Sequence, residues 1–185
     1  TELDRLAADV VTRPQLVDLV AKAERERRRL RVKFGIDPTF KDVHLGHAVP
    51  IRVLRLFQQH GHLPVLILGD ATARLGDPTG RNDQRPALSK EEVEANATTY
   101  LSQIGKILDL DAARCEVRRN SEWFGKMDFF DGLKLAAQAT VARMLERDDF
   151  AQRMQAKLPL HLQTWLKPIK CQRISSRPQA ITIPS

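Results

Sequence analysis

The sequence predicts an α/β fold with a parallel sheet, and two strand–loop–helix patterns carry the prediction. In the first, apolar residues from Val32 lead into a polar turn, and a helical pattern begins at the histidines after it. In the second, the near-continuous apolar run 63–68 is typical of a strand covered on both faces of a parallel sheet. In open sheets of this kind ligands bind at the carboxyl ends of the strands, so we expect a site in the loops that follow them.

Composition and charge narrow the class of protein. The 185 residues are 42% hydrophobic, enough for one domain with a core, and the formal net charge of +7 suits a nucleotide or nucleic-acid partner. Cys115 and Cys171 are far apart in the sequence and indicate neither a disulfide framework nor a metal site, so we expect the cytoplasm. No apolar run approaches the length that spans a membrane, and we expect no membrane partner.

Residues 1–30 are predicted to form a helical extension in front of the first strand. Leu16, Leu19 and Val20 recur at helical spacing, whereas the run 24–29 is largely charged. The arginines of that run have two interpretations. They could contact a nucleic-acid backbone, or they could form a solvated helix end, where cations interact favourably with the helix dipole; we prefer the second.

Capping signals and apolar runs predict the later elements. Ser89, with Glu92 three residues on, forms a capping box that opens a helix running through Leu108. A short strand is expected around 115–117. Two or three short helices are expected over 123–150, and the apolar side chains of that stretch are most simply explained as core.

The first loop has the features of a phosphate site. His44 and His47 are three residues apart, so both rings are expected on one face of the first helical turn, and Gly46 between them leaves the backbone open to a ligand. Unpaired N–H groups and the dipole favour an anion at such a helix start. Two histidines at this spacing lack a third metal ligand, so we do not expect a protein-bound metal.

The second loop, after the strand at 63–68, is long and polar. Asp77 lies between Gly76 and Pro78, where the chain has little freedom. A carboxylate held in this way suits the ammonium group of an amino acid. A turn-forming Asp-Pro with no binding role is an equally good interpretation of these residues taken alone.

Several of these segments resemble one protein family. His-x-Gly-His is the signature of the class I aminoacyl-tRNA synthetases. Over residues 31–168 the chain resembles the bacterial tyrosyl-tRNA synthetases, on the segments GIDPT (35–39), LFQQHGHLPVLILGDATARLGDPTGRNDQRP (56–86), NSEW (120–123) and TVARMLERDDF (140–150). The resemblance implies a Rossmann-like (HUP-type) parallel sheet with flanking helices. Residues 31–167 would form the first half of this catalytic domain, ending in a connecting segment, about 121–167, that contributes to a homodimer interface.

The same resemblance implies a reaction and a set of contacts. Tyrosine would be activated with ATP to tyrosyl-adenylate and pyrophosphate and then transferred to tRNA(Tyr), with Mg²⁺ entering with ATP. The implied catalytic residues are Thr39, His44 and His47. The implied ATP site comprises Asp37, Pro38, Thr39, His44, Gly46 and His47.

The implied amino-acid site lies on both loops. Thr72 and Asp77 would hold the substrate amino group, and Lys33 and Gly35 would line the pocket. Lys33 departs from the family pattern, because it stands where many members have a tyrosine that binds the phenol hydroxyl, which puts tyrosine specificity in doubt at this contact. Asp70 stands where many members have glycine, although related sequences accept an aspartate there.

Residues 168–185 are predicted to be an irregular tail outside the family pattern, which we explain most simply by truncation. A doubly wound sheet cut in half leaves an open strand edge, so we expect a dimer or higher oligomer. Two functions remain in view. The chain is the core of a tyrosine-activating ligase, or it is a catalytically incomplete remnant that binds a nucleotide or tRNA.

Overall fold

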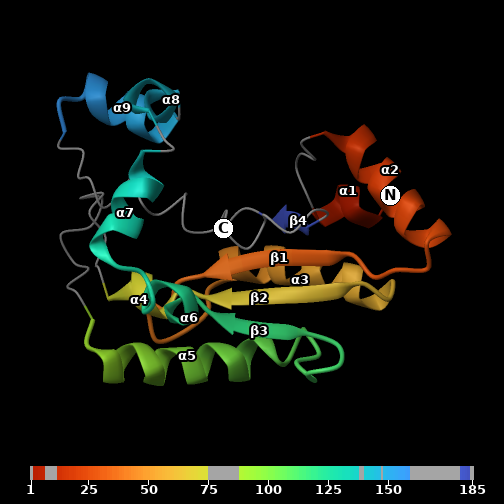
Figure 1. Ribbon diagram of the computed structural model, residues 1–185. Helices are drawn as coiled ribbons and strands as arrows, with labels where there is room; N and C mark the ends of the chain where they lie inside the picture. The colour runs from red at the N-terminus through yellow and green to blue at the C-terminus, as the bar shows by residue number, and fades with distance from the viewer. Residues whose placement is uncertain are drawn as a thin grey trace.

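The computed structural model describes residues 2–6, 12–74, 88–137, 140–146, 148–158 and 180–183. Within these ranges the chain forms one parallel sheet with the strand order β3-β2-β1-β4 (Figure 1). The strands are β1 (Arg31–Ile36), β2 (Leu63–Leu68), β3 (Glu116–Arg119) and β4 (Ala180–Ile183). The predicted α/β class with parallel strands is confirmed.

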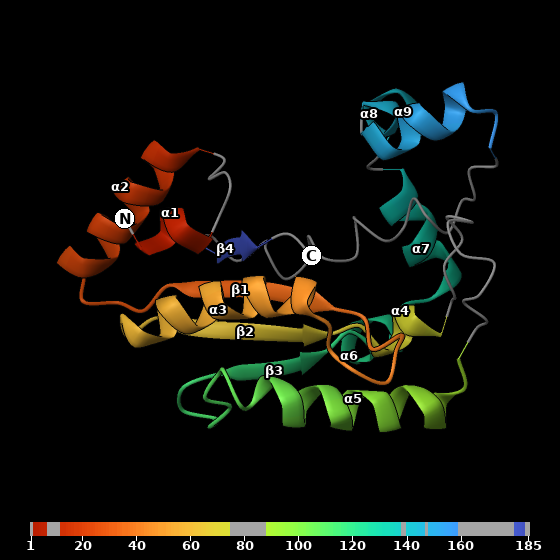
Figure 2. The same ribbon diagram turned by 180° about the vertical axis from the view of Figure 1, so that it is seen from behind.

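Helices α3 (Leu45–Gln59) and α5 (Lys90–Ile104) pack against the sheet, and Figure 2 shows both from the side that they cover. Alternate residues of β1 and β2 meet apolar residues of the two helices, as expected for strands buried by crossover helices. Tyr100 and Phe34 are among the largest fully buried side chains. The core consists of Val32, Phe34, Ile36, Ile51, Val53, Leu54, Phe57, Leu66, Leu68, Ala97, Tyr100, Ile104, Leu108 and Cys115.

The predicted capping box at the start of α5 is confirmed. The backbone N–H of Glu92 donates to Oγ of Ser89 at 3.1 Å, and the backbone N–H of Ser89 donates to Oε2 of Glu92 at 2.8 Å. These bonds satisfy two of the N–H groups that a helix start leaves unpaired. The pKa of the Glu92 carboxyl is lowered because it accepts this backbone hydrogen bond.

The N-terminal extension contains two helices, α1 (Glu2–Leu6) and α2 (Arg13–Arg25), where the sequence suggested one. Thr12 adopts a left-handed conformation, with φ of 53°, directly before α2. The helix therefore restarts there, and Pro14 occupies its first turn, where proline is tolerated. Arg29 donates to the carbonyls of Gly61 and Ala113 at 3.1 and 3.0 Å, which gives this arginine a structural role.

A buried glutamine organises the loop between α5 and β3. The Nε2 of Gln58 donates to the carbonyls of Asp109 (2.8 Å) and Arg114 (3.0 Å), while its Oε1 accepts from the backbone N–H of Asp109 (3.1 Å) and from Arg55 (2.7 Å). Gln58 is 3% exposed. Its amide therefore joins the end of α3 to the middle of the loop and to its end before β3.

The connecting segment contains α6 (Ser121–Phe124), α7 (Phe129–Ala136), α8 (Val141–Leu145) and α9 (Asp148–Gln155). Figure 1 shows α7, α8 and α9 beyond the carboxyl ends of the strands, away from α5. The expectation that its apolar residues are core is wrong for part of the segment. Phe129, Phe130, Leu133 and Val141 are more than half exposed, because no described element of the chain covers them.

The C-terminal tail is not irregular throughout. Residues 180–183 form β4, which pairs in parallel with β1 in the register Arg31↔Ala180 to Phe34↔Ile183. The β-branched residues Ile181 and Ile183 pack against the core, which accounts for the strand. The expected open edge at β1 is therefore covered over these four residues, whereas residues 168–179 lie outside the described part of the chain. None of the helices in the described ranges has the length and apolar character needed to cross a bilayer.

Candidate functional site

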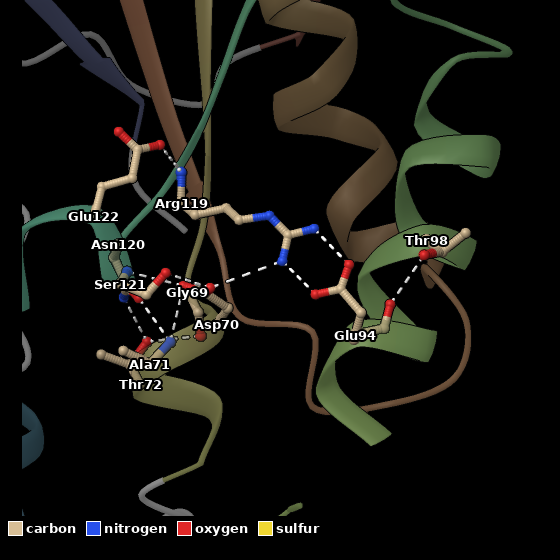
Figure 3. Close-up of polar contacts among 10 residues, drawn as sticks. All are labelled: Gly69, Asp70, Ala71, Thr72, Glu94, Thr98, Arg119, Asn120, Ser121 and Glu122. Carbon is tan, nitrogen blue, oxygen red and sulfur yellow. Dashed lines mark hydrogen bonds and ion pairs between the residues drawn. The ribbon is translucent and has the colours of Figure 1, made fainter. Parts of the chain in front are cut away.

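The carboxyl ends of β1, β2 and β3 bring polar side chains from three loops together. β1 is followed by Asp37, β2 by Gly69 and the short helix α4 (Asp70–Ala73), and β3 by Asn120. Ile36 is in register with Leu68, so the first residues after these two strands meet. Figure 3 shows the contacts that connect α4 with the end of β3 and with α5.

A directed series of hydrogen bonds runs across these loops. The backbone N–H of Ala71 donates to Oδ1 of Asn120 at 2.8 Å, and Nδ2 of Asn120 donates to Oγ1 of Thr72 at 2.9 Å (Figure 3). The Ala71 N–H fixes which end of the amide is oxygen, so the hydroxyl of Thr72 must accept from Asn120. Its proton then faces two acceptors, Oδ1 of Asp37 at 2.7 Å and the carbonyl of Gly69 at 3.0 Å, of which the carboxylate is the nearer.

Gly69 makes the contact between the first two loops possible. A Cβ at this position would lie 1.8 Å from Oδ1 of Asp37 and 2.5 Å from Oγ1 of Thr72. The φ angle of Gly69 is −83°, which other residues adopt readily. Space, and not backbone conformation, therefore requires a glycine here.

The two histidines at the start of α3 lie together, as their spacing predicts. Their ring centroids are 3.7 Å apart with an interplanar angle of 23°, so the imidazoles are stacked. A Cβ on Gly46 would lie 3.0 Å from the ring of His44, so the glycine makes room for this ring. His44 is exposed and occupies the N-cap without a side-chain cap, and His47 is half-buried with its ring centroid 6.2 Å from that of Tyr100.

Two polar residues of α5, which the sequence analysis did not identify, hold the loop between β1 and α3. Asn96 donates to the carbonyl of Pro38 at 3.2 Å. Gln103 accepts from the backbone N–H of Val43 at 2.8 Å and donates to Asp42 at 2.7 Å. Asn96 and Gln103 are seven residues apart and share one helix face, a pattern that could have revealed them.

The remaining predicted residues are placed as follows. Lys33 is 3% exposed and lies on β1 between the core residues Val32 and Phe34, so its position faces the other side of the sheet. Gly35 is in register with Ile67, near the carboxyl end of β1. Thr39 follows Pro38, and its backbone N–H donates to the carbonyl of Asp37 at 2.8 Å. Asp77 lies outside the described residues. Over the described ranges, no group of three His, Cys, Asp or Glu residues could hold a metal ion.

Comparison with known proteins assigns the family. The model of the family "tRNA synthetases class I (W and Y)" matches residues 25–166. The chain belongs to this family of class I tRNA synthetases. Among its curated relatives, the tyrosine–tRNA ligase of Thermotoga maritima is 50% identical over 167 residues, which is 90% of this chain and 40% of the relative. The tyrosine–tRNA ligase of Xanthomonas axonopodis pv. citri is 54% identical over 140 residues, which is 76% of this chain and 34% of the relative.

Solved synthetase structures agree with this assignment. A C-terminally truncated mitochondrial tyrosyl-tRNA synthetase of Aspergillus nidulans matches with a TM-score of 0.65 and 27% identity, over 82% of this chain and 46% of that one. The tyrosyl-tRNA synthetase of Archaeoglobus fulgidus, solved with L-tyrosine, has the same fold, with a TM-score of 0.65 and 22% identity. The match covers 91% of this chain and 48% of the Archaeoglobus fulgidus chain. The Rossmann-like architecture is thereby confirmed. The chain spans about two fifths of the length of the first curated relative.

Proposed function

We propose that the chain forms part of a tyrosine–tRNA ligase and supplies residues that bind ATP and tyrosine. One observation carries the proposal. The loops after β1 and β2, which hold the histidine pair and Thr72, are joined at the sheet edge by the 2.7 Å bond between Thr72 and Asp37. A site that joins an amino acid to a nucleotide needs its two binding loops side by side, because both substrates must meet in reactive geometry.

The proposed ATP site is the loop from Asp37 to His47. The start of α3 has no side-chain cap, and the N–H of His47 donates to the carbonyl of His44 at 2.9 Å. The N–H groups of Leu45 and Gly46 would therefore meet the phosphate oxygens, and the helix dipole favours the same charge. Thr39 and His44 would meet the leaving pyrophosphate, with Pro38 shaping the turn before them. His47 and Gly46 would lie beside the ribose and adenine. Mg²⁺ belongs to the substrate here and would enter with the ATP phosphates.

The proposed amino-acid site uses the directed hydrogen bonds around Thr72. A hydroxyl has two lone pairs, and Asn120 uses one of those of Thr72, so the other can accept from the ammonium group of tyrosine. Asp77 would supply the opposite charge. Lys33 and Gly35 would line the side-chain pocket from β1, with the buried Lys33 at the position that would lie near the phenol.

The proposed reaction needs no protein nucleophile. A carboxylate oxygen of tyrosine attacks the α-phosphorus of ATP, the bond from that phosphorus to the bridging oxygen breaks, and pyrophosphate leaves with the electron pair. Negative charge grows on the leaving group, and donors already in place at the start of α3 stabilise it. Transfer to the 3′ end of tRNA(Tyr) would follow, in the cytoplasm.

The proposed assembly is a homodimer formed through the connecting segment. Five large apolar side chains in its described part are more than half exposed in the single chain, namely Phe129, Phe130, Leu133, Val141 and Met154. Exposed apolar patches mark interaction sites, and most soluble oligomers are symmetric assemblies of identical chains, so a second copy would cover these residues.

A second candidate is a catalytically incomplete protein that binds nucleotide or tRNA. The observation that favours it is coverage, because the chain matches only 40% of the length of the Thermotoga maritima ligase. Binding without turnover is the property that distinguishes it from the ligase.

The exchange of pyrophosphate into ATP, run with tyrosine, tryptophan or no amino acid, tests the proposal. We expect tyrosine-dependent exchange that is lost in the double variant His44→Ala, His47→Ala and kept in His60→Ala, which removes an exposed histidine from the other end of α3. Exchange that depends on tryptophan would contradict the amino-acid assignment. Absence of exchange in a folded chain that binds ATP would favour the second candidate.

A further inference from the structure

Asp70, the first residue of α4, is fixed by a dense set of contacts with the end of β3 (Figure 3). Its Oδ1 accepts from the backbone N–H groups of Ala71 and Ser121, both at 2.9 Å, and its Oδ2 accepts from Oγ of Ser121 at 2.6 Å. The Asp70 side chain is 14% exposed. A largely buried carboxylate with three donors is a rigid anchor, because ionised acceptors form the stronger hydrogen bonds.

An arginine extends this anchor to α5. The Arg119 guanidinium lies 3.8 Å from Oδ2 of Asp70 and forms a two-pronged pair with Glu94, in which Nη2 donates to Oε1 at 2.7 Å. This hydrogen bond raises the pKa of Arg119 and lowers the pKa of Glu94, so both groups stay charged. Figure 3 shows Arg119 reaching from the end of β3 across to α5. The end of β3 and α5, which are distant from α4 in the sequence, are thus both connected to its first residue.

The anchor acts on the residue proposed to bind the substrate amino group. The Ala71 N–H donates to both Asp70 Oδ1 and Asn120 Oδ1, and it is this N–H that sets the direction of the amide of Asn120. Asn120 in turn donates to Thr72, which is 5% exposed. A shift of the peptide between Asp70 and Ala71 would therefore turn Asn120 and move the hydroxyl of Thr72.

We propose that Asp70 is a positioning residue for the amino-acid site. It fixes α4 against the end of β3, so that Thr72 presents a lone pair to the α-ammonium group of an amino acid. The proposal rests on the proposed function for the identity of the ligand, and the anchor itself can be tested without any ligand.

Three variants separate positioning from general stability. Asp70→Ala removes every acceptor. Asp70→Asn keeps one oxygen for the two N–H groups, while its amide nitrogen can donate to the hydroxyl of Ser121. Glu122→Gln is the matched control, because Glu122 follows Ser121 on α6. It accepts from Arg118 and from the backbone N–H of Arg119, whereas the hydrogen bonds to Asp70 come from Ser121 and Ala71.

The first measurement is amide hydrogen exchange in the ligand-free chain. We expect the amides of Ala71 and Ser121 to exchange at least tenfold faster in Asp70→Ala than in the unchanged chain, with near-normal rates in Asp70→Asn and Glu122→Gln. Amides of α5 should be unaffected, which shows that the fold is retained. Unchanged exchange at Ala71 and Ser121 would overturn the anchor.

The second measurement is the dissociation constant of tyrosine and, separately, of ATP, by calorimetry. We expect Asp70→Ala to weaken tyrosine binding by tenfold or more while ATP binding changes less than twofold, and Asp70→Asn to restore most of the affinity. Equal losses for both ligands, or no loss for tyrosine, would overturn the positioning role. If the unchanged chain binds ATP but not tyrosine, the amino-acid part of the proposed function and the positioning role both fail. The amide hydrogen exchange rates still show, without any ligand, whether Asp70 anchors α4.

Discussion

The substitution Gly69→Ala is the sharpest test of how the two loops meet. The added Cβ would lie 1.8 Å from Oδ1 of Asp37, well inside contact distance, so the carboxylate must retreat by more than ~1 Å. That movement breaks its bond with Thr72, which is now 2.7 Å long. A hydrogen bond to a charged group contributes about 1.5–3 kcal/mol. We expect the free energy of unfolding to fall by about that amount.

Urea unfolding, followed by circular dichroism, measures this change. The control is Gly132→Ala in α7, where a Cβ would meet no atom of the described residues within 4 Å, apart from its own helix backbone. That variant should be neutral or slightly stabilising, because alanine favours a helix by up to ~1 kcal/mol over glycine. Unfolding free energies for Gly69→Ala within ~0.5 kcal/mol of the unchanged chain would refute the close approach of Gly69, Asp37 and Thr72.

Three further results are expected from other parts of the fold. Gln58→Leu should destabilise the chain by about 2–4 kcal/mol in urea unfolding, because it leaves buried backbone groups without partners, and a loss below ~1 kcal/mol would contradict the role of the glutamine. In a Cys171→Ala background, a thiol reagent at pH 8 should modify Cys115 only after unfolding, since burial raises the pKa of this thiol to about 11; rapid labelling of the folded chain would contradict its burial. Burial, with a smaller effect of His60, lowers the pKa of His62 below its ordinary 6.5. As the pH falls, His62 therefore takes up a proton in the unfolded chain before it does so in the folded chain. The free energy of unfolding should consequently fall as the pH drops below about 6.5. His62→Asn should flatten that part of the stability profile, and an unchanged profile would show that other groups cause it.

Local patterns were sufficient for much of the fold. The strands at 31–36 and 63–68 and the capping box at Ser89 are encoded by neighbouring residues, so the sequence predicts them directly. The stacking of His44 and His47 follows from helical spacing in the same way. Such features need no knowledge of which distant segments meet.

Contacts between distant segments were not predictable in this way. The bond between Thr72 and Asp37 joins loops 35 residues apart and depends on the register of β1 and β2. Asn120 was identified only as part of a family segment, since its role requires β3 to end beside α4. The expectation that Phe129 belongs to the core was also wrong, since its side chain is exposed. An apolar residue type alone does not reveal whether the same chain covers it. At 180–183 the β-branched residues were present, but the irregular sequence before them concealed the strand.

The most direct test of the proposed site is an NMR titration of the chain with tyrosine, observing backbone amides and the side-chain amide of Asn120. We predict saturable shifts concentrated at the carboxyl ends of β1, β2 and β3, including Thr72 and Asn120, with much weaker shifts for tryptophan at the same concentration. Tyrosine-induced shifts that are absent from these loops, or that are matched by tryptophan, would contradict the account.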